Sequence, residues 1–346
     1  MSHPDTHSPP GKPPVTPERM MQFAFGYAPP LMIEAAVRHR VFDVLDAGPR
    51  TVAEVSAETG ASERGLRAVM NALVGLGLLA KDDAGRYTLT PESAAFLVSG
   101  KPGFFGGLFR HTTSQLLPPW MQMTEIVRTG RPAMAVNQEG AGAEFFEAFV
   151  EDIFPNSYPG ARALAGALGV AGAEGPVSVL DLAAGSGVWG IALAQASPQV
   201  QVTAVDWPQV VPVTRRVASR FGVADRFRYI EGDLHDADFG TGHQIATLGH
   251  ILHSEGEERS RALLGKVFDA LAPGGVIAIA EMLTNEERTG PPHALIFAVN
   301  MLVNTDQGDT YSFGEISRWL QDAGFVNPRT LDAPGPSPLI LADKPA

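Results

Sequence analysis

From residue 177 onward, short apolar runs alternate with longer segments of helical periodicity. The runs are VSVLDLA, QVTAVDW, FRYIEGD, HQIATLG and GVIAIAEML. Such runs, separated by helices, are typical of parallel strands that are covered on both faces. Near the C-terminus, GFVNPRTLDA and SPLILADKP flank a turn at Pro334–Pro336 and predict an antiparallel pair. We therefore expect residues 173–346 to form an α/β domain with a doubly wound sheet.

The first half of the chain has a different pattern. Residues 1–18 contain six prolines and almost no apolar side chains, which predicts a disordered tail. From residue 19 the apolar positions are too dense for one stripe, so these helices are expected to be buried on several sides, within the chain or against a partner subunit. Residues 51–90 predict a helix, a turn, a second helix and a hairpin, so residues 19–100 are interpreted as a winged-helix dimerisation domain. Residues 101–172 are expected to be a helical linker that contributes to an apolar acceptor pocket.

A winged helix either binds DNA or serves as a scaffold for packing and dimerisation. Between Thr51 and Thr90 there are four basic and five acidic residues, and the whole chain has a formal net charge of −12. A recognition helix needs a basic outer face, and an acidic protein is not drawn to nucleic acid or anionic membranes. We expect the scaffold role, with neither nucleic acid nor membrane as a partner.

The composition excludes several kinds of chemistry. The chain has no cysteine, so disulfides, thiolate metal sites and a cysteine nucleophile are ruled out. No apolar run approaches the roughly 20 residues of a membrane helix. The N-terminal segment also lacks the basic start and apolar stretch of a secretory signal. These features predict a cytoplasmic protein.

A glycine-rich loop follows the first predicted strand. In LDLAAGSGVWG, Gly185, Gly187 and Gly190 match the G-x-G-x-x-G spacing of dinucleotide sites, and Asp206 ends the next strand. The spacing taken alone suggests an NAD-dependent oxidoreductase.

Acidic residues around this loop favour another nucleoside ligand. Asp181, Asp206 and Asp233 follow or end the first three predicted strands. A pyrophosphate needs free N–H groups at the helix start and no fixed anion beside it. Carboxylates suit a ligand with a cationic end, and S-adenosylmethionine has both a sulfonium and an ammonium group.

The order of the motifs strengthens this interpretation. VLDLAAGSG, AVDWPQVV, GDLH, LAPGGVIAIAE and AGF…LILADK resemble the motifs of class I S-adenosylmethionine-dependent methyltransferases. With the winged helix in front, residues 20–345 resemble the small-molecule O-methyltransferase family of plant phenylpropanoid and bacterial polyketide pathways. The resemblance implies a Rossmann-like seven-stranded methyltransferase sheet, S-adenosyl-L-methionine as cofactor and a homodimer. It implies methyl transfer to a hydroxyl of a small, partly apolar metabolite. S- or C-methylation by the same fold and a winged-helix regulator stay open as alternatives.

The resemblance also implies which residues bind the cofactor. In the family the methionine end lies on the glycine loop, and the nucleoside is held after the second and third strands. The matching positions are Asp181, Ala183, Gly185 and Gly187 for the methionine end, Asp206 for the ribose hydroxyls, Trp207, Asp233 and Leu234 for the adenine, and Gly249 for a backbone contact after the fourth strand.

His253 matches the histidine of the family and ends the segment TLGHILH. An imidazole, with an ordinary pKa near 6.5, can take a proton from a phenol around neutral pH, so His253 is the expected general base. Ser254 and Glu255 replace the usual aspartate and tryptophan, and Thr310 stands where a glutamate often orients the histidine. Three acids nearby are candidates for that orienting role: Glu255, Glu257 and Asp309.

The segment PPHALIFAVNMLVNTDQGDTYSF is expected to form a wall of the acceptor site. Asn300 and Asn304 share one helix face, where they either fix a polar substituent or make hydrogen bonds between helices. Together with Met301 and His250 they are the predicted substrate-binding residues. His250 and His253, three residues apart, also have the spacing of metal ligands. Because this stretch starts in a loop, we expect no metal.

Overall fold

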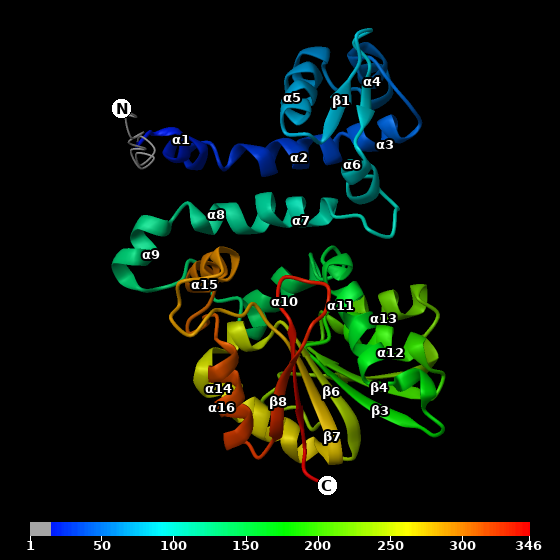
Figure 1. The fold of residues 1–346 in the computed structure, drawn as a ribbon, viewed down its shortest axis with the longest axis vertical. Coiled ribbons are helices and arrows are strands. Elements are labelled where there is room, and N and C mark those ends of the chain that lie inside the picture. The colour runs from blue at the N-terminus through cyan, green and yellow to red at the C-terminus, as the bar shows by residue number, and fades with distance from the viewer. Residues whose placement is uncertain (1–14) are drawn as a thin grey trace, which may run out of the picture.

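The computed structural model describes residues 15–346. Residues 1–14, and with them most of the predicted tail, lie outside the described residues. The last residue of that tail, Glu18, already begins helix α1. Figure 1 shows the helical N-terminal region at the top, a layer of helices in the middle and the sheet domain below.

The N-terminal region is helical with one short hairpin, as predicted. Thr51 and Ser62 begin their helices because each side-chain oxygen accepts a backbone N–H of the first turn. Gly60 ends the first of these two helices in the left-handed conformation, at φ 72°. The elements are α1 (Glu18–Ala24), α2 (Ala28–Arg38), α3 (Val41–Asp46), α4 (Val52–Thr59), α5 (Glu63–Gly75), β1 (Leu79–Lys81), β2 (Tyr87–Leu89) and α6 (Pro91–Phe96).

These elements share one hydrophobic core. Phe42, Met70, Leu73 and Tyr87 are completely buried in it. Helix α1 contributes nothing to this core, because none of its residues is buried. The apolar side chains of α1 therefore face outward in the single chain.

Residues 106–167 are mostly helical, which confirms the helical prediction for residues 101–172; α7 to α10 are short helices of the middle layer, whereas α11 packs on one face of the sheet (Figure 1). Helix α7 runs through a π-helical turn at residues 112–116 directly into α8. The helices are α7 (Gly106–His111), α8 (Leu117–Trp120), α9 (Met123–Thr129), α10 (Glu139–Glu147) and α11 (Phe154–Ala167).

The sheet has seven strands in the order β5-β4-β3-β6-β7-β9-β8. All neighbours from β5 to β7 are parallel, and β9 pairs antiparallel with both β7 and β8. This confirms the doubly wound sheet and the terminal antiparallel pair. The strands are β3 (Val177–Leu182), β4 (Val200–Asp206), β5 (Phe227–Glu231), β6 (His243–Gly249), β7 (Leu271–Ala280), β8 (Val326–Leu331) and β9 (Leu339–Asp343).

Alternate residues of the strands point into two separate cores, one on each face of the sheet. Val179 and Ile245 belong to the core covered by α11, α12 and α13, whereas Leu180 and Ala246 belong to the core covered by α14 and α16. Figure 1 shows these helices on opposite sides of the sheet. The remaining helices are α12 (Val188–Ala196), α13 (Val211–Arg220), α14 (Leu252–Ala270), α15 (Pro292–Asn304) and α16 (Phe313–Asp322).

The strand order reverses between β3 and β6. From β3 the chain continues outward to β4 and β5, and it then returns to β6 on the other side of β3. In open α/β sheets the crevice beyond the carboxyl ends at such a switch point is where ligands bind. Middle-layer residues lie over this crevice, because the Phe146 ring lies 6.0 Å from the ring of Trp207, which follows β4.

Within residues 15–346, no helix combines the length and the apolar character needed to cross a membrane.

Candidate active site

The loop after β3 is a tight turn that requires left-handed backbone. Ala183, Gly185 and Gly187 have φ values of 48°, 55° and 76°. At Gly187 a Cβ atom would also lie 2.9 Å from the Thr214 methyl carbon. The Thr214 hydroxyl donates to the Gly185 carbonyl at 2.7 Å. The loop is thus held closely against α13 and leads directly into the N-terminus of α12.

Asp181 supports this loop from beneath. Its side chain has no exposed surface, and it accepts hydrogen bonds from the Gly190 N–H (2.9 Å) and the Thr247 hydroxyl (2.7 Å). Burial raises the pKa of the Asp181 carboxyl to about 7. Both carboxylate oxygens are thus engaged within the protein, and the place of Asp181 in the methionine-end loop stays a prediction.

Asp206 ends β4 beside the glycine loop. One carboxylate oxygen accepts the Gly185 N–H and the other accepts its neighbour Trp207 N–H, both at 2.7 Å. Burial raises the pKa of Asp206 to about 6. Each oxygen accepts two or more hydrogen bonds when ionised, so this partly exposed carboxylate has capacity for a ligand diol.

The loop after β5 places Asp233 at the same edge of the sheet. Its Oδ1 accepts the His235 N–H at 2.9 Å. Leu234, in contrast, is 8% exposed and belongs to the core beneath the sheet. The Lys266 ammonium donates to the carbonyls of Leu234 (2.9 Å) and His235 (3.0 Å), which fixes the loop to α14.

His253 forms a buried pair with Glu281. The His253 Nδ1 lies 2.7 Å from the Glu281 Oε2, and Oε1 accepts the backbone N–H of Leu252 at 2.7 Å. Burial disfavours the ionised acid, but the neighbouring His253 outweighs it and lowers the pKa of Glu281. An ionised carboxylate only accepts hydrogen bonds, so Nδ1 carries a proton, and in the neutral ring the lone pair is then on Nε2. This is the tautomer that a general base requires.

None of the three candidate acids bonds to the His253 side chain, whose Nδ1 is paired with Glu281 instead. Glu255 bonds to His235 and Arg259, Glu257 pairs with Arg261, and Asp309 pairs with Arg288. The Thr310 hydroxyl donates to the Ala294 carbonyl at 3.3 Å.

Glu281 was missed although the sequence carried a signal for it. It is a single acid directly after the apolar strand β7. Strands β6 and β7 are parallel and pair Gly249 with Ala280. The residues that follow them therefore lie side by side at the carboxyl edge, which brings Glu281 to His253.

His250 lies in the same corner but has no hydrogen-bond partner for Nδ1 within residues 15–346. Its backbone is left-handed, at φ 62°. Burial lowers the pKa of His250 to about 4, so the ring is neutral around pH 7. A small cavity of about 20 Å³ lies beside it, lined also by Asn156, whose buried Oδ1 is likewise unpaired within the described part of the chain.

His250, His253 and Glu281 bring three possible metal-ligand atoms within 4.8 Å of one another. Two of these residues, however, are joined by the hydrogen bond between the His253 Nδ1 and the Glu281 Oε2. The pair has the geometry of a histidine whose ring is held by a carboxylate.

Gly249 has a steric role. A Cβ atom at this position would lie 2.0 Å from the Trp189 indole nitrogen. Trp189 is 6% exposed and belongs to the core covered by α11 and α12. Packing of this indole against β6 is thus enough to require glycine here.

The predicted acceptor wall contains a polar link between helices. The Asn300 Oδ1 accepts the Trp120 indole N–H at 2.8 Å and the Asn304 amide at 3.0 Å. Met301 is 5% exposed, and Phe297 packs edge-on against the His253 ring with 4.8 Å between ring centres. Of the polar side-chain atoms in this link between helices, the Asn304 Oδ1 is buried and has no hydrogen-bond partner among the described residues.

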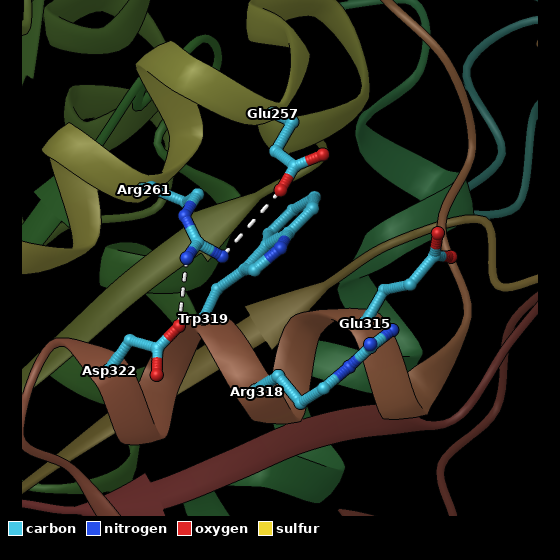
Figure 2. Close-up of a pocket in the computed structure, with 6 residues that line it drawn as sticks. All are labelled: Glu257, Arg261, Glu315, Arg318, Trp319 and Asp322. Atoms are coloured by element: carbon cyan, nitrogen blue, oxygen red, sulfur yellow. Dashed lines mark hydrogen bonds and ion pairs between the residues drawn. The ribbon is translucent and has the colours of Figure 1, made fainter.

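A further cavity, of about 290 Å³, lies between α14 and α16 (Figure 2). Arg261 is paired there with both Glu257 and Asp322. Of the residues named from the sequence, only Glu257, a candidate for orienting His253, is among those that line this cavity. Its lining carries three acids and two arginines, and we assign it no part in the active site.

The chain matches two known protein families. Residues 21–99 match the O-methyltransferase dimerisation domain, and residues 164–326 match the O-methyltransferase domain. The 3-hydroxy-5-methyl-1-naphthoate 3-O-methyltransferase of Streptomyces sahachiroi is 32% identical over 321 residues, which is 90% of this chain and 91% of that protein.

Two further relatives are a methyltransferase that acts on carbon and a protein whose structure contains S-adenosylhomocysteine. The L-tyrosine C(3)-methyltransferase of Streptomyces lavendulae is 27% identical over 97% of this chain and 95% of its own. The solved structure of PigF with S-adenosylhomocysteine is 25% identical, with a TM-score of 0.81, and covers 96% of this chain and 100% of its own. The family matches decide against the oxidoreductase and regulator alternatives. This chain belongs to the S-adenosyl-L-methionine-dependent O-methyltransferase family with an N-terminal dimerisation domain.

Proposed function

We propose that this enzyme methylates a hydroxyl group on a small, partly apolar aromatic metabolite, with His253 as the general base. The observation that carries the proposal is the hydrogen bond of 2.7 Å between the His253 Nδ1 and the ionised Glu281. In the neutral imidazole this bond puts the lone pair on Nε2, at the carboxyl edge of the sheet, where it can accept a proton. Bound S-adenosyl-L-methionine supplies a methyl group on a sulfonium.

The base acts on the acceptor hydroxyl. His253 Nε2 takes the hydroxyl proton while the oxygen lone pair forms the new bond to the methyl carbon, and the sulfur keeps the electrons of the broken bond. Glu281 stabilises the imidazolium that results. A positioned base contributes about 10²–10⁴-fold, and orientation of the reactants adds to this.

The cofactor lies, in this proposal, across the carboxyl ends of β3, β4 and β5. The backbone of Ala183, Gly185 and Gly187 receives the methionine end, and Asp206 accepts the ribose hydroxyls. The Trp207 ring and the Asp233 carboxylate contact the adenine, and Leu234 supports the adenine from the core beneath. Asp181 acts through the glycine loop that it supports, and Gly249 acts through its backbone.

The acceptor lies, in this proposal, beside the His253 ring, where Phe297 of α15 packs against that ring. Phe297 and Met301 supply apolar surface, and the Asn304 Oδ1 is a buried acceptor without a partner among the described residues. The unpaired nitrogen of His250 is a second polar position. Asn300 acts indirectly, because Trp120 and Asn304 occupy its side-chain oxygen. Such a site suits a flat apolar molecule with one or two polar substituents.

The proposal is tested by supplying labelled S-adenosyl-L-methionine to the purified enzyme together with pairs of aromatic compounds. In each pair one compound carries a free hydroxyl, and its matched control carries a methoxy group at that position. We expect label transfer to the hydroxyl members only, with the methyl on oxygen by mass and NMR analysis. Transfer to the methoxy controls at equal rates would contradict hydroxyl methylation.

Methylation of carbon is the second candidate. The L-tyrosine C(3)-methyltransferase is related over 97% of this chain. Thr310 and Ser254 also replace residues that are usual in O-methyltransferases. The NMR position of the label decides between the two, since a methyl group on ring carbon has no attached oxygen.

We further propose that the enzyme is a homodimer formed through its first helices. The match to a dimerisation domain begins at residue 21. On α1 and just after it, Met20, Met21, Phe23, Phe25 and Tyr27 are 57–65% exposed. Scattered apolar side chains are common on surfaces, but a contiguous group of this kind marks an interface.

A further inference from the structure

We propose that Glu255 is a positioning residue for the cofactor. It holds the loop after β5 against α14, so that Asp233 presents its free oxygen to the adenine amino group. The inference rests on the proposed role of Asp233 at the adenine. The proposal gives a role to Glu255, which occupies the position where this family usually has tryptophan.

Four residues form a closed ring at this place, through their side chains and one backbone N–H group. The Glu255 Oε2 accepts hydrogen bonds from the His235 Nε2 (2.9 Å) and the Arg259 Nε (2.6 Å). Arg259 also reaches the Asp233 Oδ1 at 3.6 Å. The backbone N–H of His235 donates to that same Oδ1 at 2.9 Å. The ring therefore joins two residues of the loop to two residues of α14.

Glu255 is the buried member of the ring. The residue is 5% exposed, whereas the side chains of His235, Asp233 and Arg259 are 21%, 26% and 44% exposed. A carboxylate removed from water is stable only when charged or hydrogen-bonding partners replace the lost solvation. His235 and Arg259 are these partners, so the burial of Glu255 forces both of them into fixed positions.

The ring leaves one oxygen of Asp233 available. Both contacts to the Asp233 carboxylate end on Oδ1, and within residues 15–346 no group donates to Oδ2. An adenine amino group is a donor, and an ionised carboxylate is its natural acceptor. Because Oδ1 is fixed, the direction of Oδ2 is fixed as well. Glu255 acts on the cofactor in this way without touching it.

The same helix also carries the base. His253 lies two residues before Glu255, and the chain bends at Gly256, whose φ and ψ are 80° and 168°. Glu255 is therefore anchored on the short segment that begins α14 and not on its long regular part. An aromatic side chain at position 255 offers no carboxylate to His235 or Arg259, so the ring depends on the acid found in this chain.

The test compares two ligands on three variants. S-adenosylhomocysteine has the 6-amino group, and S-inosylhomocysteine has a carbonyl oxygen in its place. The variants are Glu255→Gln, Glu255→Leu and the matched control Glu257→Gln, which alters an exposed acid of the same helix that points toward Arg261 (Figure 2). Dissociation constants come from calorimetry, and kcat and KM come from the methyl-transfer assay.

We expect the wild-type enzyme to prefer S-adenosylhomocysteine about tenfold or more, since a hydrogen bond to a charged group is worth that much. Glu255→Leu should lose most of this preference by weakening the amino ligand, with KM for the methyl donor raised and kcat changed less than about threefold. Glu255→Gln should keep part of the preference, and Glu257→Gln should keep all of it.

Several results would overturn the inference. One is a wild-type preference ratio retained in Glu255→Leu, and another is an equal loss of affinity for both ligands, which marks a merely structural role. If Glu255→Leu does not fold, the ratio in Glu255→Gln decides. A wild-type enzyme that binds neither ligand would instead contradict the proposed function itself.

Discussion

At the scale of single residues, His253 and Glu281 lie 28 positions apart in the chain but 2.7 Å apart in the structure. Both oxygens of Glu281 bind the segment that carries His253, since Oε1 accepts the backbone N–H groups of Leu252 and His253. Removing its charge therefore changes the orientation and the proton affinity of the base together.

Replacing His253 by Ala should lower kcat by about 10²-fold or more, and Glu281→Gln should lower it by about tenfold or more. Neither variant should change the affinity for S-adenosylhomocysteine by more than about twofold. Single-turnover rates and calorimetry measure the two effects separately. Unchanged turnover in His253→Ala would remove it from the role of base.

Asp206 adds a pH effect at the same scale. Its pKa is raised from an ordinary value of 3.8 to about 6 by burial, so the folded protein binds its proton more tightly than the unfolded chain. The contribution of this group to stability is fully present below about pH 4 and is lost as the pH rises through about 6. The difference in unfolding free energy between wild type and Asp206→Asn should therefore fall with rising pH.

Urea unfolding without cofactor at pH 5 and pH 8 measures this difference. Asp206→Asn should also weaken cofactor binding, because the amide offers the ribose hydroxyls one acceptor oxygen in place of two. A difference in stability that rises with pH would show that the carboxyl is not destabilised by burial.

At the scale of elements, α8 and α15 are joined by one hydrogen bond between the Trp120 indole and Asn300. Backbone bonds reinforce the link, since the N–H groups of Ala133 and Val136 donate to the carbonyls of Val303 and Asn304. The middle layer is thus held to the helix that faces His253. This arrangement makes the acceptor site a product of two distant parts of the chain.

Trp120→Phe should remove the indole donor while keeping an aromatic ring. We expect KM for the acceptor to rise about three- to tenfold, because the loss of a hydrogen bond costs about 0.5–1.5 kcal/mol and α15 shifts against α8. KM for S-adenosyl-L-methionine serves as the internal control and should stay constant. Equal changes in both KM values would contradict a role confined to the acceptor side.

At the scale of the whole molecule, α1 is a helix whose apolar side chains stay exposed in a single chain. None of its residues is buried. Phe23 and Phe25 are 65% and 62% exposed, although each would release about 1.5–3 kcal/mol on full burial. A second subunit is the proposed source of that burial.

The double variant Phe23→Ser and Phe25→Ser should therefore shift the enzyme from dimer to monomer in light scattering. The matched control is Val326→Ser, an apolar residue 40% exposed on the edge strand β8. The control should leave the assembly unchanged. A wild-type protein that is monomeric at micromolar concentration would contradict the proposed assembly.

The sequence by itself determined the order of elements and the glycine loop. Periodicity of two and of 3.6 residues is a local property, and so are caps such as Thr51 and turns such as Gly187. The place of the crevice followed as well, because parallel strands align their carboxyl ends.

Only the tertiary structure decided which side chains meet. Glu281 reaches His253 because β6 and β7 are neighbours in register, and no spacing along the chain records this. Asp181 proved to be turned inward because its partners, Thr247 and Gly190, come from elements that pack against its strand only in the fold. Side-chain chemistry is local in the sequence, whereas burial and pairing depend on contacts between distant residues, and these decide how the chemistry is used.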